Sequence, residues 1–243
     1  MGRRATYADR WAGLFPCNGG LIHEGGYRSS GGVFLENAKS LAVFTVYNTS
    51  FDHGIEGCRY ATKKFKEWRY RFEAVEESEF RTMGIAEAMV KLGDVTRDPH
   101  PCEITKRFNH LADGDHFWLR ALDRIPREWD PAAEIRIRGE WPKDREKQRE
   151  AVWNQVRSEC ASLRGSIQGN RIVVTTQGVG RVRVYFDPKL VDYRNKVTVT
   201  INGKTWPPLA LKRQPDVLLT HVHETGDTSR LYWAYHDFDV GSP

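Results

Sequence analysis

The chain has 243 residues, of which 40% are hydrophobic and 28% are charged. This is the composition of a soluble globular protein, and it excludes a disordered or fibrous chain. The 37 Lys and Arg residues exceed the 32 Asp and Glu residues by a formal charge of +5. Because the two signs are interleaved and no basic stripe carries aromatic residues, we expect no nucleic-acid partner.

The four cysteines are scattered, at Cys17, Cys58, Cys102 and Cys160. No C-x-x-C pair is present, so we expect no cysteine zinc site and no other cofactor, and free thiols favour a reducing, cytoplasmic compartment. No apolar run approaches the roughly 20 residues that cross a bilayer, and the first residues lack the apolar core of a signal peptide. We therefore expect no membrane association, with export only if a signal has been lost upstream.

Residues 1–98 alternate between strand-like and helix-like patterns. Buried strands are predicted near Leu14–Gly20 and over Leu41–Tyr47, and Tyr70–Glu76 alternates like a strand. Helical spacing relates Ile55, Cys58, Ala61, Phe65 and Trp68, and a second helix is expected over Gly84–Gly93. The alternation predicts a parallel α/β sheet.

The segment after Tyr47 is the most informative part of this region. The apolar strand stops in the polar turn Asn48-Thr49-Ser50, and Asp52, His53 and Gly54 follow before the helix. Open α/β sheets place their chemistry in such acid-bearing loops after a strand. Asp52 is therefore a candidate catalytic acid, and the alternative is a carboxylate that caps or shapes a turn before a helix.

A boundary is predicted at Asp98-Pro99-His100-Pro101, where two prolines exclude helix. Beyond it, residues 99–243 predict an antiparallel β-sandwich that contains one charged helix over about residues 143–164. A type I′ turn is expected at Asn202-Gly203. The predicted strands are Ile104–Asn109, His116–Leu122, Ala133–Gly139, Arg171–Thr176, Arg181–Phe186, Val197–Ile201 and Arg230–Phe238, with a short helix over Gln214–Glu224.

Several polar and aromatic groups in this second region are further candidates. His221, His223 and Glu224 form an H-x-H-E group, but in a helix residues i and i+2 diverge, which favours two surface or helix-end histidines over a metal pair. Asp113, Asp115 and His116 favour a tight polar turn. The aromatic residues of the predicted strands either stack sugar rings or, as is more common, form the core or pack against a neighbouring domain: Trp118, Trp206, Tyr232, Trp233 and Tyr235.

Three stretches resemble the C-terminal part of prolyl-oligopeptidase-like esterases and peptidases, which have the α/β-hydrolase fold. Arg10-Trp11-Ala12-Gly13-Leu14-Phe15-Pro16-Cys17-Asn18-Gly19-Gly20 resembles the segment downstream of the nucleophile. Residues 41–68 resemble the acid strand, its loop and the next helix, and Glu73–Glu76 resembles the last sheet strand. Residues 169–204 resemble the β-rich extension of some bacterial members.

The resemblance implies that Asp52 is the acid of the Ser-Asp-His order, which orients and stabilises an imidazolium. The chain contains no G-x-S-x-G elbow, so the nucleophile would lie upstream of Met1. The loop Glu77–Gly84, where the family carries its histidine, has none, and Phe80 or Arg81 stands near that place. His53 is the candidate substitute base, with His100 and His110 as further alternatives.

These observations predict a partial α/β-hydrolase sheet in residues 1–98, followed by the β-sandwich extension. The expected function is that of the C-terminal part of a serine esterase or peptidase, inactive alone. Expected partners are a small ester or peptide substrate in a complete relative, and a complementing N-terminal half or a second copy paired through an exposed sheet edge. One alternative is a non-catalytic sandwich module for carbohydrate or protein, recognisable by two or three coplanar exposed tryptophans. The other is a self-contained structural protein or pseudoenzyme, which would dimerise through the exposed sheet edge.

Overall fold

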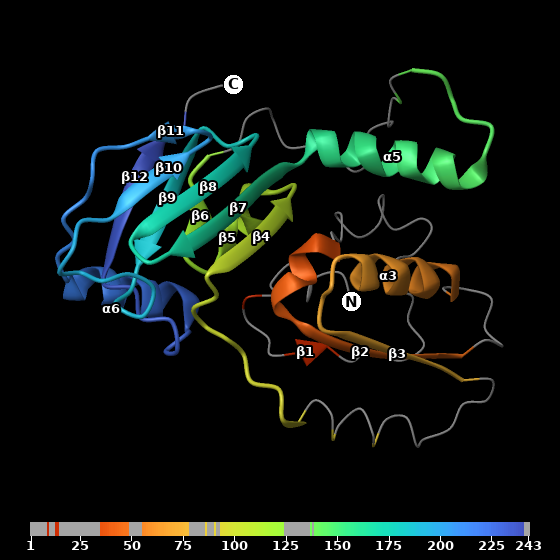
Figure 1. Ribbon diagram of the computed structural model, residues 1–243, viewed down its shortest axis with the longest axis horizontal. Helices are drawn as coiled ribbons and strands as arrows, with labels where there is room; N and C mark the ends of the chain where they lie inside the picture. The colour runs from red at the N-terminus through yellow and green to blue at the C-terminus, as the bar shows by residue number, and fades with distance from the viewer. Residues whose placement is uncertain are drawn as a thin grey trace. The chain divides into compact units, whose positions relative to one another are not determined.

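The computed structural model divides the chain into two compact units, Met1–Asp98 and Pro99–Pro243 (Figure 1). The structure describes residues 9, 13–14, 35–48, 55–77, 86, 90, 93–123, 137 and 139–240. This part of the chain is rich in β-sheet, with a parallel, a mixed and an antiparallel sheet and few helices. Among the described residues, no helix combines the length and apolarity needed to cross a bilayer.

The first unit contains a parallel sheet in the order β1-β2-β3. Its strands are β1 (Gly13–Leu14), β2 (Ala42–Asn48) and β3 (Phe72–Glu77). The 3-10 helix η2 (Leu35–Ser40) precedes β2, and α3 (Ile55–Glu67) connects β2 to β3. The strands predicted over 41–47 and 70–76 and the helix between them are confirmed, with their ends shifted by one or two residues.

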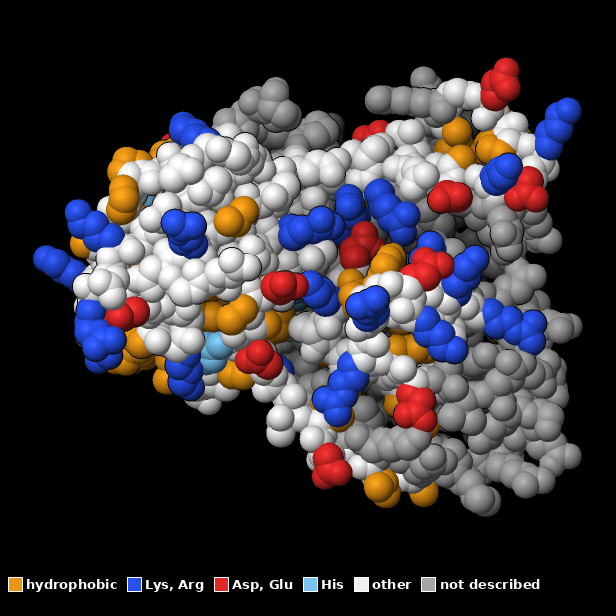
Figure 2. Space-filling model, in the orientation of Figure 1, with side chains coloured by type: hydrophobic (Ala, Val, Ile, Leu, Met, Phe, Trp, Pro, Cys, Tyr) orange, Lys and Arg blue, Asp and Glu red, His pale blue; other side chains and the backbone are white. Residues whose placement is uncertain are grey.

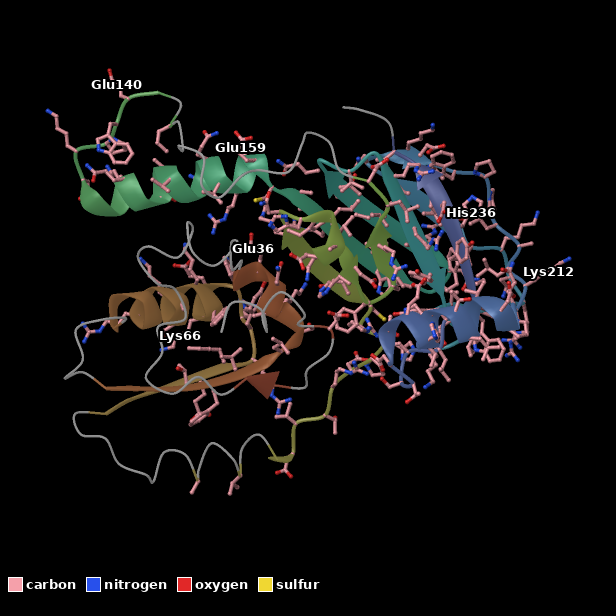
Figure 3. The ribbon with its side chains drawn as sticks, turned by 180° about the vertical axis from the view of Figure 1, so that it is seen from behind. Glu36, Lys66, Glu140, Glu159, Lys212 and His236 are labelled. Atoms are coloured by element: carbon pink, nitrogen blue, oxygen red, sulfur yellow. The ribbon has the colours of Figure 1, made fainter. Side chains whose placement is uncertain are left out.

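Aromatic packing fixes α3 against this sheet. Phe65 on α3 is 1% exposed, and its ring lies 4.8 Å from that of Phe72 on β3 and 5.6 Å from that of Tyr70. The Tyr70 hydroxyl donates to the backbone oxygen of Glu36 at 3.2 Å (Glu36 is labelled in Figure 3). These contacts enclose a small core with Ala38, Leu41, Val43 and Ala61.

Helix α3 ends in a Schellman motif. The Tyr70 amide donates to the Phe65 carbonyl at 3.0 Å, and the Arg69 amide donates to the Lys66 carbonyl at 3.1 Å. Arg69 has a φ of 56°, in the left-handed region where glycine is the usual residue. The motif reverses the chain directly into β3.

The second unit contains two sheets that share one core. One sheet has the order β11-β10-β8-β7-β4, and the other has the order β12-β9-β6-β5. The strands are β4 (Glu103–Phe108), β5 (Asp115–His116), β6 (Leu119–Ala121), β7 (Ala161–Gln168), β8 (Arg171–Gln177), β9 (Arg181–Phe186), β10 (Thr198–Ile201), β11 (Lys204–Thr205) and β12 (Ala234–Asp239). The helices are η3 (Leu111–Asp113), α5 (Arg145–Glu159) and α6 (Pro215–Thr225).

Trp118 lies at the centre of this core. Its ring is fully buried, and its indole Nε1 donates to the backbone oxygen of Pro101 at 2.8 Å. Phe117, before it, has a φ of 51° and turns the chain between β5 and β6. On the edge strand β12, the ring of Phe238 contacts those of Trp206 at 5.4 Å and His236 at 4.7 Å (His236 is labelled in Figure 3).

The structure corrects the predicted helix over residues 143–164. Helix α5 ends at Glu159, and Cys160 is already extended, with φ −94° and ψ 148°. Residues 161–168 form β7, in which buried and less buried positions alternate, so Leu163 belongs to the sheet core. The period-two pattern decides the outcome because a strand here buries every second side chain between the two sheets.

The prediction of a wholly antiparallel second region is also wrong, because β8 and β10 pair in parallel, with Thr198 opposite Arg171. Strand β9 lies between them in sequence but belongs to the other sheet, so the chain crosses the core and returns in the direction of β8. The predicted strand His116–Leu122 is split by the turn at Phe117, and the last strand begins at Ala234 rather than Arg230.

The predicted turn at Asn202-Gly203 can be compared with the structure, whereas two other predicted elements cannot. The type I′ turn is confirmed by φ values of 48° at Asn202 and 82° at Gly203. The predicted strand Ala133–Gly139 and the helix Gly84–Gly93 lie largely outside the described residues.

Candidate functional site

Asp52 and His53, the predicted catalytic pair, lie outside the described residues, but the elements on both sides of them are described. Strand β2 ends at Asn48, and α3 begins at Ile55. The loop that carries the candidate acid therefore leaves the carboxyl end of a parallel strand and leads into a helix. This is the position at which open α/β sheets carry catalytic and binding residues.

The carboxyl ends of β2 and β3 lie side by side. The two strands are paired in parallel from Val43, opposite Phe72, to Asn48, opposite Glu77 at the end of the ladder. The loops that follow these strands therefore start from the same edge of the sheet. Residues 78–84, which follow β3, contain no histidine.

His100 and His110, the other candidate bases, have places within the second unit. The His100 side chain is 8% exposed, and its Nε2 lies 3.8 Å from Oδ1 of Asp187, whose side chain is 5% exposed. Asp187 Oδ1 also accepts the Lys189 amide at 2.7 Å. His110 is exposed at the start of η3, where its carbonyl accepts the Asp113 amide at 2.9 Å.

A row of charged side chains crosses the four-stranded sheet. The strand register places Asp115 opposite Arg120, Arg120 opposite Arg183, and Arg183 opposite Asp237. The ion pair Arg120–Asp115 measures 3.0 Å, and Arg120 also reaches Glu224 on α6 at 3.0 Å. Arg183 forms a bidentate pair with Asp237, at 2.7 and 2.9 Å.

These contacts fix the protonation of both guanidinium groups. Burial is the largest single effect and lowers the pKa of Arg120. The charges of Asp115 and Tyr185 and the hydrogen bonds to Asp115 and Glu224 together outweigh it, and the pKa lies above its ordinary value. The hydrogen bonds from Arg183 to Asp237 raise the pKa of Arg183. Because both arginines are already paired with carboxylates, this row has the character of a structural ladder rather than an anion-binding site. On the face seen in Figure 2, basic and acidic side chains are interspersed.

Tyr185 and Tyr235 join this row to an aromatic group. The Arg183 guanidinium lies 3.8 Å from the ring centre of Tyr235 and 5.9 Å from that of Tyr185. Burial raises the pKa of the Tyr185 hydroxyl, which therefore stays protonated at neutral pH. A neutral phenol can both donate and accept a hydrogen bond, and here its oxygen accepts from the Arg183 guanidinium.

The two histidines of the H-x-H-E group lie on different sides of α6. His221 is 2% exposed, whereas His223, two residues later, is exposed, as expected for diverging positions on a helix. The interpretation of both as surface or helix-end residues is wrong for His221. Burial, and after it the charge of Arg230, lower the pKa of His221 to about 4. Across the described parts of the chain, no group of three His, Cys, Asp or Glu side chains is placed to hold a metal ion.

The aromatic candidates are mostly core residues. Trp118 and Tyr232 are fully buried, and Tyr235, at 40% exposure, has the Arg183 guanidinium over its ring. Trp206 and Trp233 are half-buried. The described residues therefore contain no pair of coplanar exposed tryptophans of the kind that a carbohydrate-binding face would require.

Arg120, Arg183 and Tyr185, which belong to the charged row and its aromatic neighbours, were not among the residues singled out from the sequence. Strand alternation predicts which face of the sheet these side chains occupy. Whether they contact one another depends on the register between β6, β9 and β12. The polar cluster Asp113, Asp115 and His116 was correctly assigned to a tight turn region: it forms the end of η3 and the start of the β5–β6 hairpin.

Comparison of the chain with protein-family models, curated proteins and solved structures finds no match.

Proposed function

We propose that this chain is the C-terminal portion of an α/β-hydrolase-like serine esterase or peptidase, that it supplies the triad acid Asp52, and that it is inactive by itself. The observation that carries this assignment is the parallel order β1-β2-β3, with an acid-bearing loop between β2 and α3 at the carboxyl edge. The family that the sequence resembles arranges its last sheet strands and its acid in this order.

The chemistry of a complete relative defines what Asp52 would do. The serine oxygen attacks the carbonyl carbon of the ester or amide while a histidine takes its proton, and the leaving group departs with that proton. Water then attacks the acyl-enzyme and releases the acid and the serine. Asp52 would orient the histidine and stabilise its imidazolium form.

This chain lacks the other two parts of that mechanism. Its sequence contains no G-x-S-x-G motif, and the loop Glu77–Gly84 contains no histidine. His53 is the substitute base in this proposal, adjacent to Asp52. Without a nucleophile and its oxyanion donors, the chain has no means to form the acyl-enzyme, so we expect no turnover from the chain alone.

The partner in this proposal is a complementing N-terminal segment. Within the described residues, β1 pairs only with β2, so the other side of β1 is where a further parallel strand would add. A second copy of the chain, paired through the same edge, is the competing occupant. Residues 99–243 would be the β-sandwich extension of the family, a role supported by the two sheets around one core.

Hydrolysis of p-nitrophenyl acetate by the purified chain tests the assignment. We expect no turnover above buffer for the wild-type chain or for Asp52→Asn. When the wild-type chain is mixed with a segment that carries the serine elbow, we expect turnover that Asp52→Asn abolishes and that the exposed control Asp94→Asn retains. Turnover by the chain alone that disappears in Asp52→Asn or His53→Asn would overturn the inactive assignment.

A further inference from the structure

Helix α6 is attached to the four-stranded sheet through few side chains. Of its residues, only Val217 and His221 are buried. Its C-terminal turn is held by the ion pair of Glu224 with Arg120 at 3.0 Å, in which the Glu224 side chain is 44% exposed. Exposed pairs of this kind contribute little to stability. The attachment of α6 therefore depends strongly on the environment of His221.

His221 is buried without hydrogen bonds. Its imidazole lies edge-on to two rings, 5.1 Å from Tyr185 and 4.8 Å from Tyr232, and neither Nδ1 nor Nε2 has a hydrogen-bond partner. A buried polar group in this state has lost its water contacts without replacement. The neutral imidazole tolerates these surroundings much better than the charged one.

The charges around the imidazole act in both directions: Arg230, the largest of them, and Arg120 lower the pKa of His221, whereas Asp115 and Asp227 raise it. The buried Arg230 is bonded to Asp227 at 2.8 Å, and Arg120 is bonded to Asp115 and Glu224, so most nearby carboxylate charge is already neutralised. Asp115 Oδ1 is buried and has no hydrogen-bond partner. The titratable and charged groups that act on His221 are Asp115 on β5, Arg120 on β6, Tyr185 on β9, Tyr232 before β12, and Asp227 and Arg230 in the loop after α6.

We propose that α6 is a helix released by acid: protonation of His221 detaches α6 from the four-stranded sheet and uncovers the stacked rings of Tyr185 and Tyr232. These two rings lie 5.2 Å apart at 21°, and Tyr185 is only 3% exposed while α6 is in place. The chain can bend at Gly226, which follows the helix with a φ of 66°. This device belongs to the second unit and does not depend on the hydrolase assignment.

The direction of the pH effect follows from the two states of His221. In the attached state the pKa is lowered to about 4, whereas in the detached state the imidazole regains its ordinary value of 6.5. The detached state therefore binds a proton between these values, so attachment is complete above pH 6.5 and weakens as the pH falls towards 4. At pH 5, the equilibrium constant for detachment should be up to about thirtyfold larger than at pH 7.5.

Hydrogen exchange followed by mass spectrometry tests this proposal in the full chain. At pH 7.5 and 5.0, after correction for intrinsic exchange, we expect the protection of residues 215–225 to fall by up to about thirtyfold. The hairpin β7–β8, residues 161–177, is the internal reference and should keep its protection. Unchanged protection of α6, or an equal loss in both segments, would overturn the proposal. Increased protection would also overturn it, and would indicate that the imidazolium bonds to Asp115 Oδ1 and holds the helix.

Two substitutions on the same helix assign the effect to one imidazole. His221→Leu retains an apolar contact and cannot take up a proton, so α6 should lose its acid response. His223→Leu, on the exposed side of α6, should retain the full response. If His221→Leu does not fold, His221→Gln provides a second side chain that is neutral at both pH values. An acid response that persists without His221, or that disappears in His223→Leu, would contradict the mechanism.

Discussion

Gly165 on β7 lies directly against the ring of Trp118. A Cβ at residue 165 would stand 2.3 Å from Cη2 of Trp118 and 3.0 Å from Cδ1 of Leu119. Since Trp118 is fully buried and its indole is bonded to Pro101, the ring has little freedom to retreat. The contact explains why β7 carries glycine at a buried position of its alternating pattern.

Gly165→Ala should therefore destabilise the second unit by about 1–3 kcal/mol, the usual cost of overpacking a core. Urea unfolding followed by tryptophan fluorescence measures this loss. Ser166→Ala, at the neighbouring and less buried position of β7, is the matched control and should unfold close to the wild type. Equal midpoints for Gly165→Ala and the wild type would show that Trp118 moves without cost.

Arg69→Gly should stabilise the first unit by about 1 kcal/mol, because glycine adopts the left-handed conformation of a Schellman motif without the steric cost of a Cβ. Arg69 is exposed with a φ of 56°. Thermal unfolding followed by circular dichroism measures the gain. Arg71→Gly, two residues later where φ is not positive, should instead cost about 0.5–1 kcal/mol. A destabilised Arg69→Gly chain would argue against this helix end.

Arg183→Lys should weaken the four-stranded sheet by about 1 kcal/mol, since lysine keeps the charge but loses both the bidentate pair with Asp237 and the planar contact with Tyr235. The free energy of unfolding in urea is the measurement. The control is Arg181→Lys on the same strand, where the pair with Asp123 spans 3.8 Å and the arginine side chain is 54% exposed. Similar losses in both variants would show that the geometry at Arg183 has no special value.

Arg194→Gln should raise the pKa of Asp192. The hydrogen bond from the Arg194 side chain is the main cause that lowers the pKa of Asp192 to about 2. Because the folded-state pKa is depressed, the contribution of this carboxylate to stability is present above the ordinary value of 3.8 and is lost as the pH falls through 2. NMR titration of the Asp192 carboxyl carbon measures the shift, with Arg213→Gln as a control. A value that stays near 2 without Arg194 would contradict this cause.

Local patterns predicted most of the strands, because each strand buries every second residue. The strand Ala161–Gln168 follows the same rule but was predicted as helix, because its glycine and short polar residues come directly after α5 and look like a continuation of that helix. The parallel pairing of β8 with β10 could not be predicted locally, since it depends on β9 leaving for the other sheet.

In the candidate sites, too, local sequence predicted some features, whereas others depend on contacts between residues distant in sequence. Helical divergence correctly separated His221 from His223, but the burial of His221 depends on Tyr185 and Tyr232, which are distant in sequence. The position of Asp52 after an apolar strand was readable from the sequence, and the structure adds that β2 and β3 end at one edge. The nucleophile of the proposed mechanism has no counterpart in the sequence of this chain, and His53 stands in for the histidine that residues 77–84 lack.

The nucleotide sequence immediately upstream of the Met1 codon tests the central claim most directly. The account predicts that one of the three forward frames encodes a strand, then G-x-S-x-G, then a helix, with further strands before them. Such a segment would make this chain the acid-bearing part of a serine hydrolase. An upstream region that encodes no such elements in any frame would contradict the hydrolase assignment.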